Sequence, residues 1–321
     1  METLQEVRVR VLSKNDIGFF FNSLEEFKNS IYGLEKTKET YINSVSKFFK
    51  WIESNQVQYV DIQTLERFRA EMIEKYSATS VNVLITGIKA YYNFLESHYQ
   101  VTNIARSLKG VRKSTQPKKD SLSIQEVHDL LSELESDTSS KGVRDKAIIT
   151  LMIYTGLRTC EVVRADIQDI RTVNGKKVLY VMGKGHTEKD DFVELTRDVQ
   201  HALNDYLRTR EAPGSHDPLF VSECNRTKGQ RLSTRGLRNI VKDRFSEVGI
   251  NSENISTHSL RHTSVTLALI GGASIQKAQA MARHSNISTT QIYAHNLERL
   301  DENNAENSIQ RLLRKERTYA Y

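Results

Sequence analysis

Long apolar runs, cysteines and prolines are scarce in this chain of 321 residues. No apolar run approaches the roughly 20 residues that a membrane span requires, and the N-terminus lacks the basic-then-apolar pattern of a signal peptide. The only two cysteines, Cys160 and Cys224, exclude a disulfide framework and a cysteine-based zinc cluster. With three prolines and fifteen glycines the chain is not collagen-like. We therefore expect a globular cytoplasmic protein with reduced thiols and no membrane contact.

Basic residues exceed acidic ones, which gives a net charge of +6. This excess is compatible with a DNA partner, although many soluble proteins are mildly basic. Its distribution says more, because residues 106–119 contain six basic residues and no acidic one. These candidate DNA-binding residues are Arg106, Lys109, Arg112, Lys113, Lys118 and Lys119.

The same stretch predicts a domain boundary. Residues 110–121 contain a glycine and a proline and lack apolar periodicity, so a helix is not expected there. The chain length suits about two domains of roughly 100–200 residues each. We predict an N-terminal domain over 1–109, a basic linker over 110–121 and a second domain over 122–321.

Apolar residues at helical spacing predict an all-helical first domain, with helices near 41–52, 62–72 and 81–95. Asp61 is the expected N-cap of the second of these. Ser23 and Glu26 form a capping-box pattern that predicts a short helix after them. Residues 6–12 alternate in the manner of a strand.

The second domain has a mixed pattern. Ser123 and Glu126 predict a helix start, and an apolar run at 146–154 predicts a buried helix. Two segments rich in β-branched and aromatic residues predict a hairpin with its turn at Lys184–Gly185. Helical patterns follow near 197–210, 234–248, 258–270 and 274–283, and a short amphipathic helix is expected over 306–317. The fold class is therefore mainly α with a small β-hairpin or sheet.

The densest chemical signal is the sequence HSLRH at 258–262. Residues three apart share one face of a helix, so His258 and Arg261 can point at one target. A phosphate suits this pair, because arginine offers a planar fork of donors and histidine carries a proton near neutral pH. One alternative is a surface helix with basic residues. Another is a metal site at His258 and His262, which lacks a suitably spaced carboxylate.

Three further segments carry weaker signals. Arg158 follows Gly156 at a break between two helical patterns, where it is either an incidental residue of a helix-turn-helix, which this motif alone favours, or an arginine held rigidly enough to clamp a phosphate. Lys184 stands at the hairpin tip, where it is either a solvated loop residue or a mobile proton donor. His284 precedes Tyr293 by nine residues, a spacing that alone means little.

Taken in order and spacing, these residues resemble the active-site set of the tyrosine recombinases, the family of phage integrases and Xer enzymes. The resemblance covers nearly the whole chain, and the all-helical first domain is similar to the family's core-binding domain. The residues concerned are Arg158, Lys184, His258, Arg261, His284 and Tyr293. The segments that carry the resemblance are TGLRTCEV, VMGKGHTEK, THSLRHTSVTLALIGG and ARHSNISTTQIYAH.

The sequence departs from the family pattern at a few positions. Arg283 stands where the family usually has glycine, which changes the backbone freedom next to His284. Asp190 and Asp191 stand where the hairpin is commonly basic and followed by proline. Thr257 holds a position often taken by proline. None of these departures removes a catalytic side chain.

The resemblance implies a chemistry for each residue. Tyr293 attacks the scissile phosphate and forms a 3′-phosphotyrosyl intermediate. Arg158 and Arg261 bind the non-bridging oxygens and offset the charge of the transition state. Lys184 protonates the departing 5′-oxygen. Since cationic side chains do the electrostatic work, we expect no metal, no ATP and no other cofactor.

The histidines and the partners follow from the same resemblance. His258 is the expected general base or proton relay, and His284 the expected hydrogen-bond donor to the phosphate. Family members act as four protomers on two DNA sites, so we expect a homotetramer on double-stranded DNA with a specific recombination site, associated with the nucleoid. The segment with Ile309, Leu312 and Leu313 is expected to dock in a neighbouring subunit or to pack on its own domain.

Other functions remain open at this point. A type IB topoisomerase shares the chemistry, but the core-binding domain and the HSLRH motif argue against it. A non-catalytic DNA-binding accessory protein of the same fold is disfavoured by the intact set of six residues, and a metal-dependent nuclease is a distant alternative. About 20 residues precede the first helix, too few for an arm-binding domain, which favours a simple Xer-like or small-element enzyme. The target sequence and the choice between integration or excision and dimer resolution stay open.

Overall fold

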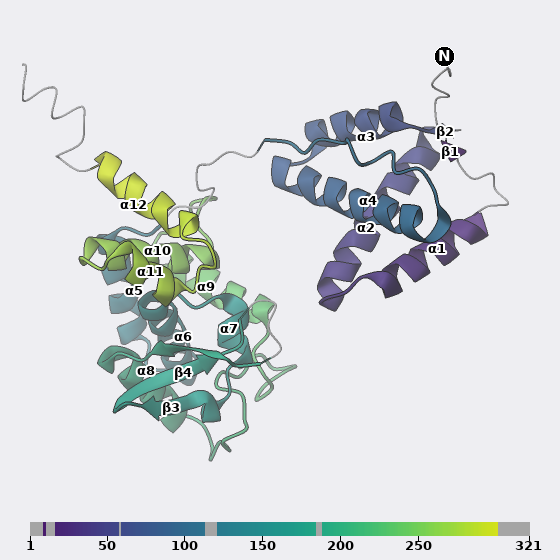
Figure 1. Cartoon of the computed structure of the whole chain (residues 1–321). Coiled ribbons are helices and arrows are strands. Elements are labelled where there is room, and N and C mark those ends of the chain that lie inside the picture. Colours follow the sequence, from purple (N-terminus) through teal and green to yellow (C-terminus); the bar gives the residue numbers. More distant parts are fainter. Residues whose placement is uncertain (1–8, 11–16, 58, 113–120, 184–187, 301–321) are drawn as a thin grey trace, which may run out of the picture. The chain divides into compact units, whose positions relative to one another are not determined.

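The computed structural model describes residues 9–10, 17–57, 59–112, 121–183 and 188–300. The chain divides into two compact units, Met1–Thr115 and Gln116–Tyr321, called here unit 1 and unit 2. Each unit has a hydrophobic core of its own. Figure 1 labels their helices and strands. Over the described ranges, none of the helices combines the length and the apolar character needed to cross a membrane.

Unit 1 is built from helices around an aromatic core. Phe48 from the second helix meets Phe68 from the third with ring centroids 5.0 Å apart, and Phe27 from the first meets Tyr91 from the fourth at 5.3 Å. A two-residue antiparallel ladder joins β1 (Val9–Arg10) to β2 (Tyr59–Val60). The helices are α1 (Ile17–Ser30), α2 (Glu35–Ser54), α3 (Ile62–Lys75) and α4 (Ala78–Tyr99).

The predicted pattern of unit 1 is confirmed for α2, α3 and α4. Asp61 caps α3 as expected, since its side chain accepts a hydrogen bond from the Thr64 amide at 2.8 Å. The helix start predicted at Ser23 is wrong, because α1 begins at Ile17 and runs through this residue. Ser23 is fully buried and its hydroxyl bonds the Tyr91 hydroxyl at 2.9 Å, so a tertiary contact uses the group that a cap would need.

Unit 2 packs its helices around α6, whose residues Ile148, Ile149 and Leu151 are fully buried. Helices α5, α8 and α10 all contact α6, which explains why residues 147–153 of this helix form an unbroken, mostly apolar run. The predicted capping box of Ser123 and Glu126 is present at the start of α5. The helices are α5 (Ile124–Ser136), α6 (Ser140–Thr155), α7 (Thr159–Arg164), α8 (Arg197–Arg208), α9 (Thr234–Glu247), α10 (Thr257–Ile270), α11 (Ile275–Ala282) and α12 (Ser288–Leu300).

A three-stranded antiparallel sheet of order β3–β4–β5 adjoins these helices (Figure 1). Strands β4 (Lys176–Val181) and β5 (Asp191–Glu194) form the predicted hairpin, with Val181 opposite Asp191. The sequence interpretation missed β3 (Ile170–Val173), which pairs with β4 across Asn174 and Gly175. Both turn residues have positive φ, 49° and 77°, as a two-residue hairpin turn requires. The predicted turn at Lys184–Gly185 and the predicted helix over 306–317 lie outside the described residues.

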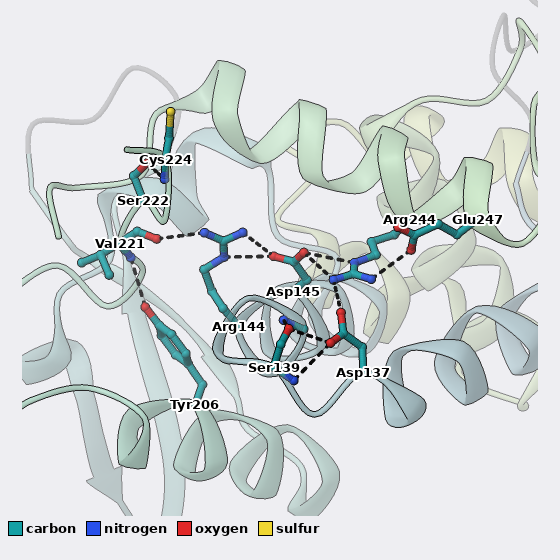
Figure 2. A network of polar contacts seen from close by, with 11 residues as sticks. Asp137, Ser139, Arg144, Asp145, Tyr206, Val221, Ser222, Cys224, Arg244 and Glu247 are labelled. Atoms are coloured by element: carbon teal, nitrogen blue, oxygen red, sulfur yellow. Dashed lines mark hydrogen bonds and ion pairs between the residues drawn. The ribbon is translucent and has the colours of Figure 1, made fainter. Parts of the chain in front are cut away.

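A buried ionic network joins α5, α6 and α9 (Figure 2). The Asp145 carboxylate accepts hydrogen bonds from Arg144 Nη2 at 2.7 Å and from Arg244 Nε at 3.0 Å. Arg244 also binds Asp137 at 2.7 Å and Glu247 at 2.9 Å. The side chains of Arg144, Asp145 and Arg244 are 3%, 1% and 8% exposed, so each charge depends on its partners. The network fixes the N-terminal half of α6, the helix whose C-terminal end leads to Arg158.

Candidate active site

The break between α6 and α7 places Arg158. Gly156 ends α6 with φ 61°, a left-handed conformation that glycine adopts without strain. A Cβ at this position would lie 3.2 Å from Ser264 Oγ, so the corner is also sterically tight. Arg158 follows in extended conformation as the N-cap of α7. The Gly-marked break expected from the sequence is confirmed.

A buried carboxylate holds Arg158 in place. Glu161, one turn into α7, is fully buried and accepts from the Arg158 amide at 2.7 Å and from Arg158 Nη1 at 2.8 Å. The arginine side chain itself is 28% exposed, so part of its guanidinium faces outward. Sequence reasoning gave Glu161 no role, although an acidic residue in the first turn of a helix is favoured by the unpaired backbone N–H groups there.

Arg261 connects two corners of unit 2. It lies on α10, is 3% exposed, and its Nη1 donates to the Gly156 carbonyl at 2.6 Å. Its Nη2 donates to the carbonyl of Ala282, the last residue of α11. Burial and the nearby charge of Arg158 lower the pKa of Arg261, which still lies well above neutrality. The two arginines predicted from the sequence are therefore neighbours, and Arg261 is charged at neutral pH.

His258 and His262 lie one turn apart on α10, with ring centroids 4.6 Å apart. The side chain of His258 is exposed. Partial desolvation of its ring, followed by the charges of Arg261 and Arg158, lowers the pKa of His258. The helix thus presents His258 and Arg261 close together, as the spacing predicted.

The corner between α11 and α12 carries His284. Its Nδ1 bonds the Thr290 hydroxyl at 2.9 Å, and its carbonyl accepts from Gln279 Nε2 at 3.0 Å. The preceding residue, Arg283, has φ 52°, so an arginine adopts the conformation in which the family usually has glycine. Arg158 Nη2 reaches the Arg283 carbonyl at 3.4 Å, which links this corner to the α6–α7 corner. Burial and neighbouring cations, Arg261 first, lower the pKa of His284 to about 4.

Tyr293 lies on α12 and packs on a small apolar cluster of α10 and α11. Its hydroxyl forms a hydrogen bond with Nδ1 of His262. Burial raises the pKa of Tyr293 to about 12, and the opposing effect of Arg261 is smaller. Burial, with His258 and Arg261 next, lowers the pKa of His262 to about 4. The phenol is therefore protonated at neutral pH and lies against a neutral imidazole. Sequence reasoning weighed His262 only as a metal ligand and missed this contact.

The structure thus brings five of the six predicted catalytic residues into one cluster, while Lys184 lies outside the described residues. Of the six basic residues predicted to bind DNA, Lys113, Lys118 and Lys119 also lie outside the described residues. Lys109 and Arg112 are exposed, and Arg106 pairs with Glu96 at 2.8 Å while its side chain stays 74% exposed. The five clustered residues are Arg158, His258, Arg261, His284 and Tyr293.

The alternative of a metal site at His258 and His262 finds no third ligand in the described part of the chain. There, no group of three or more His, Cys, Asp and Glu side chains is arranged so that it could hold a metal ion. What the cluster offers instead is positive charge and hydrogen-bond donors around a tyrosine hydroxyl.

Comparison with known proteins identifies this arrangement. The model of the phage integrase family matches residues 120–299, and the model of the phage integrase N-terminal SAM-like domain matches residues 20–98. The chain belongs to the phage integrase family of tyrosine recombinases. Its mainly helical fold, with a SAM-like N-terminal region and a small antiparallel sheet, is the fold that the resemblance implied.

Curated relatives of this tyrosine recombinase include several Xer enzymes. The chain is 31% identical to tyrosine recombinase XerD of Rickettsia bellii over 299 residues, which cover 89% of this chain and 90% of the relative. It is 31% identical to XerC of Pelobacter propionicus over 251 residues, which cover 78% and 80%, respectively. It is 28% identical to XerD of Staphylococcus epidermidis over 280 residues, which cover 85% and 93%.

Solved structures show the same fold. The post-cleavage complex of the XerH recombinase aligns with a TM-score of 0.70 at 22% identity, over 92% of this chain and 90% of that one. A lambda integrase fragment bound to a core site aligns with a TM-score of 0.63 at 15% identity, over 84% and 96%. The protein is thus a tyrosine site-specific recombinase, and this function holds over the topoisomerase and accessory-protein alternatives.

Proposed function

We propose that this recombinase cleaves one strand of duplex DNA with the Tyr293 hydroxyl, which forms a 3′-phosphotyrosyl ester and releases a 5′-hydroxyl. Rejoining follows when the 5′-hydroxyl of another strand attacks that ester, so the bond energy is conserved without ATP. The observation that carries the proposal is the contact of the Tyr293 hydroxyl with His262 of α10, the helix that also presents Arg261 and His258.

The two arginines bind the phosphate. A guanidinium has five N–H donors, and the protein uses two on Arg158 and two on Arg261. The remaining donors serve the non-bridging oxygens and stabilise the charge that develops in the transition state. His284 donates a further hydrogen bond to the phosphate, held in place by Thr290.

Protons move through the histidines and a lysine. Tyr293 has a raised pKa, so its proton must leave as the phosphorus–oxygen bond forms. Neutral His262 accepts it, and His258, whose ring lies next to it, relays it. The cations that lower both imidazole pKa values are offset when the phosphate binds, which raises imidazole basicity when it is needed. Lys184 protonates the departing 5′-oxygen.

The DNA partner and the domain roles follow from the family. We assign 1–109 to core binding, 110–121 to a linker on the DNA backbone and 122–321 to catalysis, in a protein that acts on the nucleoid in the cytoplasm. Support comes from the relatives in complex with DNA, XerH with its difH site and lambda integrase with its core site. Phosphate contacts by the linker would set register rather than sequence. The basic residues of the linker and of the segment just before it are Arg106, Lys109, Arg112, Lys113, Lys118 and Lys119.

We assign the active assembly to four protomers on two DNA sites. A hollow of about 360 Å³ in unit 2 is lined by α5, α6, α10 and α11, with mostly apolar side chains such as Val127, Leu131 and Leu267. It suits the apolar residues Ile309, Leu312 and Leu313 of a neighbouring protomer's C-terminal segment. Charged substitutions in the hollow should leave DNA binding by one protomer intact and abolish the tetramer.

The test uses DNA selected by the protein itself. The Tyr293→Phe protein first selects binding duplexes from fragmented genomic DNA of the source organism. The selected duplex is then synthesised with single nicks at successive positions, so that cleavage releases a short fragment and traps the enzyme. Wild type should form a covalent protein–DNA adduct that resists detergent, Tyr293→Phe should form none, and Tyr180→Phe, on the sheet, should behave as wild type. Absence of a wild-type adduct at every nick position contradicts the proposal.

A further inference from the structure

Arg283 makes contacts that no glycine at its position could make. Its side chain is 8% exposed. Nη2 donates to Glu161 Oε2 at 2.8 Å, and Nη1 donates to the Met281 carbonyl at 2.8 Å. Glu161 is the carboxylate that also holds Arg158, so the two arginines share one buried anion. Through it the corner that carries His284 is fastened to α7.

The backbone conformation of Arg283 indicates that its side-chain contacts stabilise this corner. Arg283 has φ 52° and ψ 49°, a left-handed conformation that is strained for residues with a Cβ. Glycine would adopt it freely. An arginine that keeps the conformation must gain enough from its contacts to offset the strain, and the contacts just described are the ones available.

The charges of Glu161, Arg158 and Arg283 indicate what the contacts of Arg283 do. Burial raises the pKa of Glu161, but Arg283 and then the groups of Arg158 outweigh it, so the carboxyl is ionised. Without Arg283, Glu161 and Arg158 would form a neutral pair, and the carboxylate would draw the whole Arg158 guanidinium toward itself. With Arg283 present, the three groups carry one net positive charge, and Arg158 keeps donors for a substrate.

A second carboxylate faces the other edge of the same guanidinium. Asp191, at the start of β5, places Oδ2 4.0 Å from Arg283 Nε. That Nε is buried and makes no hydrogen bond with any residue that the structure describes. The Asp191 side chain is 49% exposed, so its contribution is weaker than that of Glu161. Arg283 and Asp191 are both departures from the tyrosine recombinase pattern, and in this fold they meet with opposite charges.

We propose that Arg283 is a positioning residue of the cleavage site, which offsets the charge of Glu161 so that Arg158 remains free to bind the scissile phosphate. It acts through Glu161 and Arg158, and it does not touch the DNA. The inference rests on the proposed function, since it needs phosphate chemistry at Arg158.

Three substitutions separate charge from shape. Arg283→Gly removes the side chain and relieves the backbone, Arg283→Gln keeps a long polar side chain without charge, and Arg283→Lys keeps the charge. We expect Arg283→Gly and Arg283→Gln to slow adduct formation on the selected nicked duplex at saturating DNA by about 10- to 100-fold, the effect of a misplaced catalytic group. The rate of Arg283→Lys should stay within about threefold of the wild-type rate, because this variant keeps the charge that offsets Glu161.

The affinity for DNA should hardly change. Half-saturating DNA concentrations, measured in the Tyr293→Phe background, should agree within about twofold for all three variants, since Arg283 does not reach the phosphate. Asp191→Asn is the matched control on the other edge of the guanidinium and should lose less than threefold in rate. Circular dichroism and thermal unfolding establish that each variant is folded.

A double-mutant cycle tests the route through Glu161. Glu161→Gln removes the anion that Arg283 offsets, so Arg283→Gly should cost about threefold or less in that background, against 10- to 100-fold in wild type. The proposal is overturned if Arg283→Gly lowers the rate of adduct formation equally in both backgrounds. It is also overturned if Arg283→Gln is as active as Arg283→Lys, or if Arg283→Gly cleaves at the wild-type rate. A wild type that forms no adduct refutes the proposed function instead, so the two failures are distinguishable.

Discussion

Removing the charge of Asp145 should destabilise unit 2 and leave unit 1 unaffected. Asp145→Asn keeps the shape of the side chain but leaves Arg144 and Arg244 buried with one anion fewer. Arg244 retains Asp137 and Glu247, whereas Arg144 retains, among the described residues, only the Val221 carbonyl at a weak 3.5 Å (Figure 2). Breaking one partner of a buried ion pair costs about 3–5 kcal/mol, and the partners left to Arg244 place this case near 3 kcal/mol.

The two units offer an internal control. The single tryptophan, Trp51, is buried in unit 1, so its fluorescence follows the unfolding of that unit, while circular dichroism follows the helices of both. With an m-value of about 2–3 kcal/mol per molar urea for a unit of this size, the transition of unit 2 should move down by about 1 M urea. The Trp51 transition should stay in place.

A matched substitution at the rim of the network completes the experiment. Glu247→Gln removes an anion that is 45% exposed, and it should cost less than about 1 kcal/mol because solvent screens the pair. A loss below about 1 kcal/mol for Asp145→Asn, or equal losses for the two variants, would refute the reasoning that buried charges depend on these partners.

Other predictions concern the candidate site. His262→Asn keeps a neutral acceptor but removes the basic nitrogen, so adduct formation in single turnover should fall by about 10²- to 10⁴-fold; a loss under threefold contradicts proton transfer through His262. His262 and His284 have pKa values near 4 in the folded state, below the unfolded value of 6.5, so the unfolded chain binds the extra protons and stability falls as the pH drops below 6.5. From pH 7 to pH 5 we expect a loss of about 2 kcal/mol, half the full linkage value because both rings are partly exposed, and urea unfolding of a His262→Gln, His284→Gln double variant should lack it. Lys184→Ala should slow cleavage by about 10²-fold or more on ordinary DNA, whereas a substrate with a sulfur leaving group, which needs no acid, should react at nearly the wild-type rate; failure of this rescue removes the lysine as the acid.

Local patterns predicted most of the helices, because their causes are local. The Asp61 cap, the apolar run of α6 and the Ser123 capping box each act within a few residues. The start of α1 was missed since Ser23 bonds Tyr91, 68 residues away. The missed strand β3 carries a readable signal in Asn174–Gly175, the dipeptide typical of two-residue hairpins.

The candidate site was predictable only in part, because sequence patterns report local structure and not contacts between distant segments. Motif resemblance supplied the residue types and their order, and the structure gathers those that it describes. The support around them comes from contacts between distant segments, such as Arg283 with Glu161, 122 residues apart, and His262 with Tyr293, 31 apart. The position of Arg283 flagged the departure from the pattern, but only the left-handed backbone and the buried guanidinium indicate what it does.

The most direct test of the account is to identify the atom that holds the DNA. The adduct on the selected nicked duplex is digested with nuclease and protease, and the modified peptide is sequenced by mass spectrometry. The account predicts a single nucleotide joined through its 3′-phosphate to the phenolic oxygen of Tyr293. A nucleotide attached to any other residue, or through a 5′-phosphate, would contradict it.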